Sequence, residues 1–89
     1  PLAADAGRPV YVYREDVLAE CRKYGVFPTD QTPPELARSF IRDLYRYEIR
    51  QLRNRYIRTQ FSKQEYSARV VELRNKYPVL ALHARQWVV

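Results

Sequence analysis

Apolar residues first recur at helical spacing between residues 14 and 24. Val17, Cys21 and Tyr24 stand four and three positions apart, so they share one face if this stretch is an α-helix. Two acidic residues lie near the start of the segment and two basic residues near its end, which is the charge order that the helix dipole favours. Gly25 follows directly and can adopt the left-handed conformation that ends many helices. The pattern predicts a first helix over residues 14–24.

The longest helical pattern predicts a second helix over residues 33–60, since the chain from residue 35 to residue 61 contains neither glycine nor proline. Thr32 is the expected N-cap of this helix, with Pro33 in the first helical position. Glu35, three residues after the threonine, completes the sequence of a capping box. The next such box begins only at residue 62, so we expect the long helix to end near residue 60.

A third helix is predicted over residues 63–77, because Ser62 and Glu65 repeat the capping box and Pro78 stops the pattern. A kinked helix continuous with the long one is the alternative. The apolar residues of the third helix follow at intervals of four, three and four, and they are Tyr66, Val70, Leu73 and Tyr77. Residues 79–88 form a fourth helix if they are helical. Burial of the final Trp-Val-Val is worth several kcal/mol on the usual area scale, so this end should dock on the chain or on a neighbour.

These patterns predict an all-α fold. We expect one small domain over residues 14–89, a bundle of three helices, or four if the tail is helical, with one long central helix. Residues 1–13 lack helical periodicity and are predicted to be a short extended N-terminal arm. With 89 residues and only two glycines, the chain fits a small helical domain better than a turn-rich β fold. A core of this size only marginally offsets the entropy of ordering the chain, so association with another copy would help.

The long helix carries two apolar stripes that point in different directions. The stripe of its first half is predicted to be core and consists of Leu36, Ala37, Phe40, Ile41, Leu44 and Tyr47. The stripe of its second half is rotated by roughly a quarter to a third of a turn. This second stripe consists of Tyr45, Ile49, Leu52 and Tyr56. Two directions imply two neighbours, and we expect the second stripe to contact a partner, with a symmetry-related copy as the favoured candidate.

Glu48 lies between the two stripes and has no basic residue three or four positions away. A carboxylate on an apolar face needs a donor from another element. Arg55, one heptad further on and on nearly the same bearing, is a candidate donor from an antiparallel copy. The interface predicted from the sequence therefore comprises the second stripe, Glu48, Arg55 and Trp87. Alternatively, Glu48 reaches solvent at the edge of the helix.

Basic residues are concentrated after residue 32. Residues 1–32 hold four basic and five acidic residues, a net charge of −1, whereas the whole chain has a net charge of +6. A ladder of arginines at every fourth position faces away from the first stripe, and it consists of Arg38, Arg42, Arg46 and Arg50. Such a ladder can bind the phosphates of a nucleic acid, although a helix face that is only exposed to solvent can carry the same arginine spacing. No helix-turn-helix pattern accompanies it.

The chain offers little material for catalysis. Cys21 is the only cysteine and His83 the only histidine, which excludes a Cys/His zinc site and an intramolecular disulfide. Since the sequence also lacks a glycine-rich phosphate loop, we expect no enzymatic activity, no cofactor and no small-molecule substrate. No apolar run approaches the ~20 residues that cross a bilayer. We therefore expect no membrane partner and a cytoplasmic location, with Cys21 a reduced and buried hydrophobe.

Residues 44–50, Leu-Tyr-Arg-Tyr-Glu-Ile-Arg, resemble the signature of the LYR-motif family. Its members are small basic three-helix mitochondrial proteins that bind acylated carrier protein and assist the assembly of respiratory and iron–sulfur proteins. The resemblance implies that Tyr45, Arg46 and Arg50 face a partner. The family carries this motif near the start of its first helix, whereas more than forty residues and a predicted helix precede it here.

Two functional hypotheses follow from the sequence. The first is a small basic helical interaction module without catalytic activity, which associates with itself as a homodimer or with another protein. It rests on the two-sided long helix, eight tyrosines and an apolar C-terminus, because aromatic residues and arginine are enriched in interfaces. The second is a basic nucleic-acid-binding domain that uses the arginine ladder.

Overall fold

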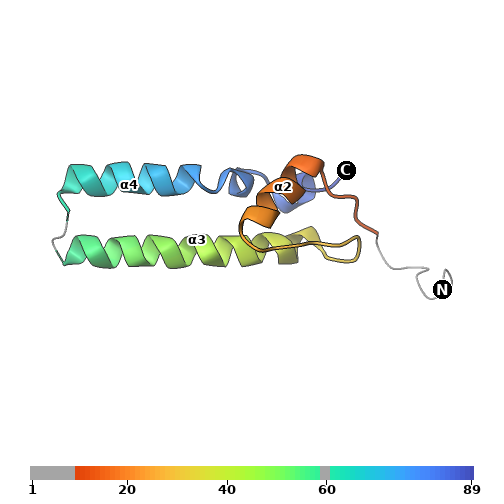
Figure 1. Cartoon of the computed structure of the whole chain (residues 1–89), viewed down its shortest axis with the longest axis horizontal. Coiled ribbons are helices and arrows are strands. Elements are labelled where there is room, and N and C mark those ends of the chain that lie inside the picture. The colour runs from red at the N-terminus through yellow and green to blue at the C-terminus, as the bar shows by residue number, and fades with distance from the viewer. Residues whose placement is uncertain (1–9, 59–60) are drawn as a thin grey trace.

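The computed structural model describes residues 10–58 and 61–89, which form the predicted all-α fold (Figure 1). Three α-helices, named α2, α3 and α4, precede two short 3₁₀ helices, named η1 and η2. Their bounds are Glu15–Lys23, Pro34–Ile57, Lys63–Asn75, Pro78–Ala81 and Ala84–Gln86. Within these residues there is no strand, only one isolated antiparallel bridge between Tyr13 and Val88.

Helices α3 and α4 run antiparallel and side by side over the length of α4, which lies beside the second half of α3 (Figure 1). The predicted cap of α4 is confirmed, because the Ser62 hydroxyl accepts a hydrogen bond from the Glu65 N–H at 3.1 Å. The chain thus reverses direction between two separate helices, and a continuous kinked helix is excluded. Positions 59 and 60, which the prediction included in the long helix, lie outside the described residues. Helix α4 ends at Asn75, two residues earlier than expected.

Helix α2 closely matches the predicted range and ends in the expected glycine cap. Gly25 has a φ of 75°, and its N–H donates to the Arg22 carbonyl at 3.1 Å. The Val26 N–H donates to the Cys21 carbonyl at 3.0 Å. In this Schellman arrangement the residues after the helix satisfy carbonyls that the last turn leaves open. The chain then runs back along α3 towards the N-terminal end of that helix (Figure 1).

The start of α3 differs from the prediction. Thr32 is not the N-cap, since Pro33 occupies that position and makes no side-chain capping bond. The Thr32 hydroxyl instead accepts a hydrogen bond from the Thr29 N–H at 3.0 Å, which closes the preceding turn. The second proline explains the shift, because Pro34 stands where a capping oxygen would seek an N–H and has none to donate.

The tail is not the fourth α-helix that residues 79–88 could have formed. It folds into η1 and η2, with extended backbone at Leu82 and His83 between them. Arg38 of α3 gives the physical reason. Its Nε donates to the Leu82 carbonyl at 2.9 Å and its Nη2 to the Leu80 carbonyl at 2.8 Å. These carbonyls bond to a guanidinium rather than to the next turn of a helix.

The C-terminus docks on its own chain. Trp87 is fully buried, and its indole N–H donates to the Val79 carbonyl at 3.2 Å. The end of the N-terminal arm pairs with the same segment, since the Val89 N–H donates to the Val12 carbonyl at 2.8 Å. The two ends of the described chain therefore close one side of the core together.

Most of the core lies at one end of the helical hairpin, where α2, the first half of α3 and the tail meet (Figure 1). Its buried members are Tyr13, Val17, Cys21, Ala37, Ile41, Leu52, Leu73, Tyr77, Val79 and Trp87. Of these buried members, Leu52 and Leu73 lie in the outer hairpin, where the partly buried Phe61, Tyr66 and Val70 pack against the same core. None of the helices in residues 10–58 and 61–89 combines the length and apolar character needed to cross a membrane.

Candidate functional site

The second apolar stripe of α3 is used inside the chain. Leu52 is buried, and Ile49 packs partly buried against the same core. Tyr56 stacks on Tyr66 of α4, with ring centres 4.4 Å apart. Helix α4 thus covers the surface that the sequence assigned to a partner, so this stripe is not available to a second copy.

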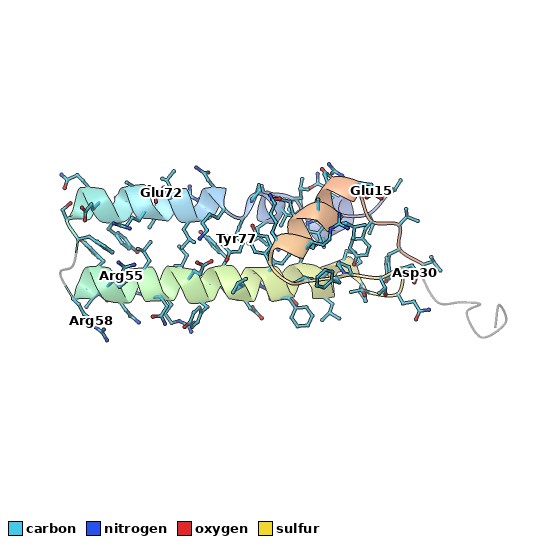
Figure 2. All side chains as sticks on the ribbon, viewed as in Figure 1. Glu15, Asp30, Arg55, Arg58, Glu72 and Tyr77 are labelled. Atoms are coloured by element: carbon cyan, nitrogen blue, oxygen red, sulfur yellow. The ribbon has the colours of Figure 1, made fainter. Side chains whose placement is uncertain are left out.

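Tyr77 joins the helices and supplies the donor that Glu48 needs (Figure 2). Its ring stacks on Tyr24 at 4.8 Å and meets Tyr45 edge-on at 5.3 Å, both distances being between ring centres. Its hydroxyl donates a hydrogen bond to the Glu48 carboxylate, which also lies 3.7 Å from the Lys76 Nζ. Burial first, and then this hydrogen bond, raise the pKa of Tyr77 well above the usual value of a phenol. Glu48 therefore finds its partners within its own chain.

The other residues of the predicted interface are engaged internally as well. The Arg55 guanidinium lies 4.7 Å from the centre of the Phe61 ring, and the Arg69 guanidinium lies 4.5 Å from the same ring. Trp87 has no exposed surface. An ion pair between Glu48 and Arg55 of another copy was inferred from a missing donor, and that reason disappears once the donor is found.

The first stripe of α3, predicted to be core, is mostly exposed. Of its six residues, Ala37 and Ile41 are buried, whereas the other four are 38 % to 57 % exposed. These four follow one another at intervals of four, four and three, and they are Leu36, Phe40, Leu44 and Tyr47. The prediction was wrong for them because the six-residue stripe is wider than the side of α3 that the tail and α4 cover.

Phe27 widens this exposed surface. It follows the glycine cap of α2 and remains 69 % exposed. The turn over residues 24–28 and the first half of α3 border a groove of about 570 Å³. We call the five exposed side chains the apolar face, and they are Phe27, Leu36, Phe40, Leu44 and Tyr47. Contiguous apolar patches on small proteins commonly mark binding surfaces.

The arginine ladder is divided by the structure. Arg38 holds the two tail carbonyls described above and is not available to a partner. Arg42 is partly buried, with its Nε 3.8 Å from the Asp43 carboxylate. Only Arg46 and Arg50 of the four remain exposed.

Arg53 joins these two residues, although the sequence interpretation missed it. Arg46, Arg50 and Arg53 border a shallow hollow of about 310 Å³ with Tyr45 and Ile49. Within the described part of the chain, no carboxylate forms an ion pair with any of the three. We call these three arginines the basic face. The signal was the i, i+4, i+7 spacing, which a strict search at every fourth position passes over.

Residues with catalytic potential are not brought together. Cys21 is fully buried, and this burial raises the pKa of its thiol to about 11, so the group is protonated at neutral pH. His83 is exposed in the tail. Over residues 10–58 and 61–89, no three histidine, cysteine or acidic side chains are grouped as metal ligands would be.

Comparisons of the chain with protein families, with curated proteins and with solved structures gave no significant match. The short resemblance to the LYR motif thus has no family match behind it. In the structure Tyr45 is partly buried and packs on the core, whereas Arg46 and Arg50 are exposed beside it. The surfaces of α3 therefore have to be interpreted from their own chemistry.

Proposed function

We propose that this chain is a small, non-catalytic protein-interaction module that receives a helix of a partner protein on its apolar face. The observation that supports the proposal is the exposed line of Leu36, Phe40, Leu44 and Tyr47, bordered by the groove beneath Phe27. A straight row of side chains along one helix, beside a groove, has the shape that ridges of a second helix fill.

The apolar face is large enough to affect binding. Full burial of such a side chain contributes about 1.5 to 3 kcal/mol, so the exposed parts of five of them offer on the order of 5 kcal/mol. Association costs at least a comparable amount in lost freedom of motion, so polar contacts at the edges are needed as well. The aromatic rings of Phe27, Phe40 and Tyr47 suit the centre of such a contact, because aromatic residues dominate interface energetics.

A photo-cross-linking experiment tests this function. Phe40 is replaced by p-benzoylphenylalanine in the full chain, which is expressed in its native cells and irradiated. Val71, which is 51 % exposed on α4 and outside the apolar face, is replaced in the same way as a matched control. We expect a covalent protein adduct from position 40 and none from position 71.

A second variant establishes that the adduct reports binding to the face. Leu44→Asp places a charge in the apolar face and should abolish the adduct from position 40. Because Leu44 is exposed, the fold should be kept, as circular dichroism can verify. Equal adducts from positions 40 and 71, or none from position 40, contradict the proposed function.

The basic face supports a second candidate function, the binding of single-stranded nucleic acid. Arg46, Arg50 and Arg53 are exposed, lie on one side of α3 and have no carboxylate partner in the described part of the chain. Each arginine that neutralises a phosphate releases counterions, so affinity should fall steeply with salt.

Fluorescence polarisation with a labelled oligonucleotide tests this candidate across a range of salt concentrations. Replacing Arg46, Arg50 and Arg53 together by Gln should lower the salt slope by about two units, at ~0.7 for each lost phosphate contact. Replacing Arg22, Lys63 and Arg85 by Gln removes the same charge from exposed positions elsewhere and should leave most of the slope unchanged. If both triple variants reduce the slope equally, binding follows net charge and the basic face is not a site.

A further inference from the structure

We infer that the helix received by the apolar face is α3 of a second copy of this chain, packed antiparallel to the first about a two-fold axis beside Leu44. This inference rests on the proposed function, since it names the occupant of the same face. Two observations carry it: the apolar face is self-complementary under a two-fold rotation, and charges of opposite sign follow one of its edges.

The self-complementarity comes from the spacing of the exposed residues. A two-fold axis beside Leu44 places this residue against the same residue of the second copy. The same rotation places Phe40 of each copy close to Tyr47 of the other. A large ring thus meets a large ring on both sides of a smaller central side chain. The row from residue 36 to residue 47 is about 16 Å long, which gives three turns of helix for the contact.

The charges along one edge of the face favour this antiparallel register. Asp43 and Arg46 lie on the same side of the apolar row, and Asp43 approaches its own Arg42 only to 3.8 Å. In the antiparallel pair, Asp43 of each copy lies beside Arg46 of the other, so each ion pair occurs twice. In a parallel two-fold pair this edge of each copy would lie on the opposite side of the contact, so Asp43 and Arg46 of the two copies would not meet. Edge charges of this kind select orientation more than they add affinity.

The other edge of the face holds the groove. Phe27 and the turn over residues 24–28 border it on the side opposite Asp43. With the axis beside Leu44, this turn of one copy meets the part of α3 around Tyr47 and Gln51 of the second copy. The Phe27 ring can then pack on Tyr47 of that copy, which would cover the most exposed aromatic side chain of the apolar face. Arg53 remains towards solvent in this arrangement.

Disulfide trapping tests the position of the axis. In Leu44→Cys the introduced thiol is exposed, whereas the native Cys21 is fully buried and does not compete. We expect mild oxidation to give a covalent dimer at low micromolar concentration. Val71→Cys, with its exposed thiol on α4, should stay monomeric under the same conditions. Dimers formed equally by both variants, or by neither, overturn the inferred arrangement.

Charge exchange tests the orientation in the unmodified background, with sedimentation equilibrium as the measurement. Asp43→Arg and Arg46→Asp should each raise the dimer dissociation constant about tenfold, and the double variant should recover most of this loss. Arg53→Asp, on the solvent side, is the matched control and should have little effect. A parent that stays monomeric up to about 100 micromolar, or a double variant weaker than both single ones, refutes the inference.

The photo-adduct from position 40 separates this inference from the proposed function. An adduct of two copies of the chain, identified by cross-linked peptides from α3, supports both. An adduct with a different protein refutes the inferred self-association while it leaves the interaction function intact. The absence of any adduct contradicts both.

Discussion

The hydroxyl of Ser62 is a single oxygen on which the start of α4 depends. It accepts the Glu65 N–H, one of the donors that a helix leaves open at its N-terminus. Ser62→Ala removes this acceptor while the N–H keeps only water as a partner. We expect a loss of about 1 kcal/mol in the free energy of unfolding, measured by urea denaturation.

Ser67 offers a matched control for this change in the same helix. It is exposed within α4, and Ala has the higher helix propensity at such a position. Ser67→Ala should therefore leave stability unchanged or raise it slightly. Equal losses for both serine variants would show that the effect is general to the helix and that the cap contributes nothing.

Buried tyrosine and cysteine side chains link the free energy of unfolding to alkaline pH, and Tyr13 and Cys21 respond first. Burial raises the pKa of Tyr13 from 10.0 to about 12 and that of Cys21 from 9.0 to about 11. Both groups lose their protons at a higher pH in the folded chain than in the unfolded chain. Their contribution to the free energy of unfolding is therefore fully present below pH 9. It is lost as pH rises from 9 towards 12, because the unfolded chain then releases these protons more readily.

We expect the urea midpoint to fall steadily from pH 9 upwards, and part of this fall to disappear in Tyr13→Phe. The variant should be less stable than the parent at pH 8, because the Tyr13 hydroxyl donates a hydrogen bond to the Thr32 carbonyl. The difference in stability between the parent and Tyr13→Phe should be smaller at pH 11 than at pH 8. A difference in stability between the parent and Tyr13→Phe that stays constant with pH would show that Tyr13 does not cause the fall.

At the scale of the element, Gly25 determines where α2 ends and how the turn with Phe27 leaves it. A Cβ built at this position meets no atom within 4 Å, so space is not the constraint. The constraint is the φ of 75°, which an L-residue adopts at a cost of about 1 to 2 kcal/mol. We expect Gly25→Ala to lower stability by that amount in urea denaturation, and Gly25→Asn to lower it less.

A synthetic chain with D-alanine at position 25 separates the cost of the positive φ from any effect of the added methyl group. D-alanine favours a positive φ and adds the same methyl group, so this chain should be at least as stable as the parent. If L- and D-alanine destabilise equally, the methyl group itself disturbs the turn and the conformational argument fails.

Elements with local signals were predicted closely from the sequence, and contacts between distant residues were not. The glycine cap and the serine cap each lie within a few residues of the helix end that they define. The hydrogen bonds of Arg38 to the Leu80 and Leu82 carbonyls join residues more than forty positions apart, and no local sequence pattern predicts them. Both stripes of α3 are apolar, so periodicity alone cannot show that α4 covers Leu52 and leaves Phe40 in solvent. Periodicity therefore located the two apolar stripes of α3 but not which of them stays exposed.

At the scale of the whole molecule, stability is unevenly distributed along the hairpin. The inner end holds eight of the ten buried core residues, among them Ile41 and Trp87 with no exposed surface. The outer hairpin relies on Leu52 and Leu73, on the stacked Tyr56 and Tyr66, and on arginines around Phe61. Segments with few buried contacts open at a lower free energy than the global core.

Native-state hydrogen exchange should therefore separate two parts of the same helix. We expect amides of α3 in residues 41–48 to exchange only through global unfolding. Amides in residues 53–57 and 67–72 should exchange at least tenfold faster, through opening of the outer hairpin alone. Leu52→Ala should lower the free energy of opening at the outer end, measured by amide exchange. This decrease should exceed the decrease in the global free energy of unfolding.

Ile41→Ala is the matched change at the inner end, and it should lower global stability by about 2 to 5 kcal/mol, since it opens a cavity at a fully buried position. Protection at both ends of α3 should then decrease, because global unfolding sets the upper limit for every amide. Uniform protection along α3 in the parent would show that the hairpin unfolds as one unit. In that case the few outer contacts would be coupled to the core through the rigid length of α3 itself.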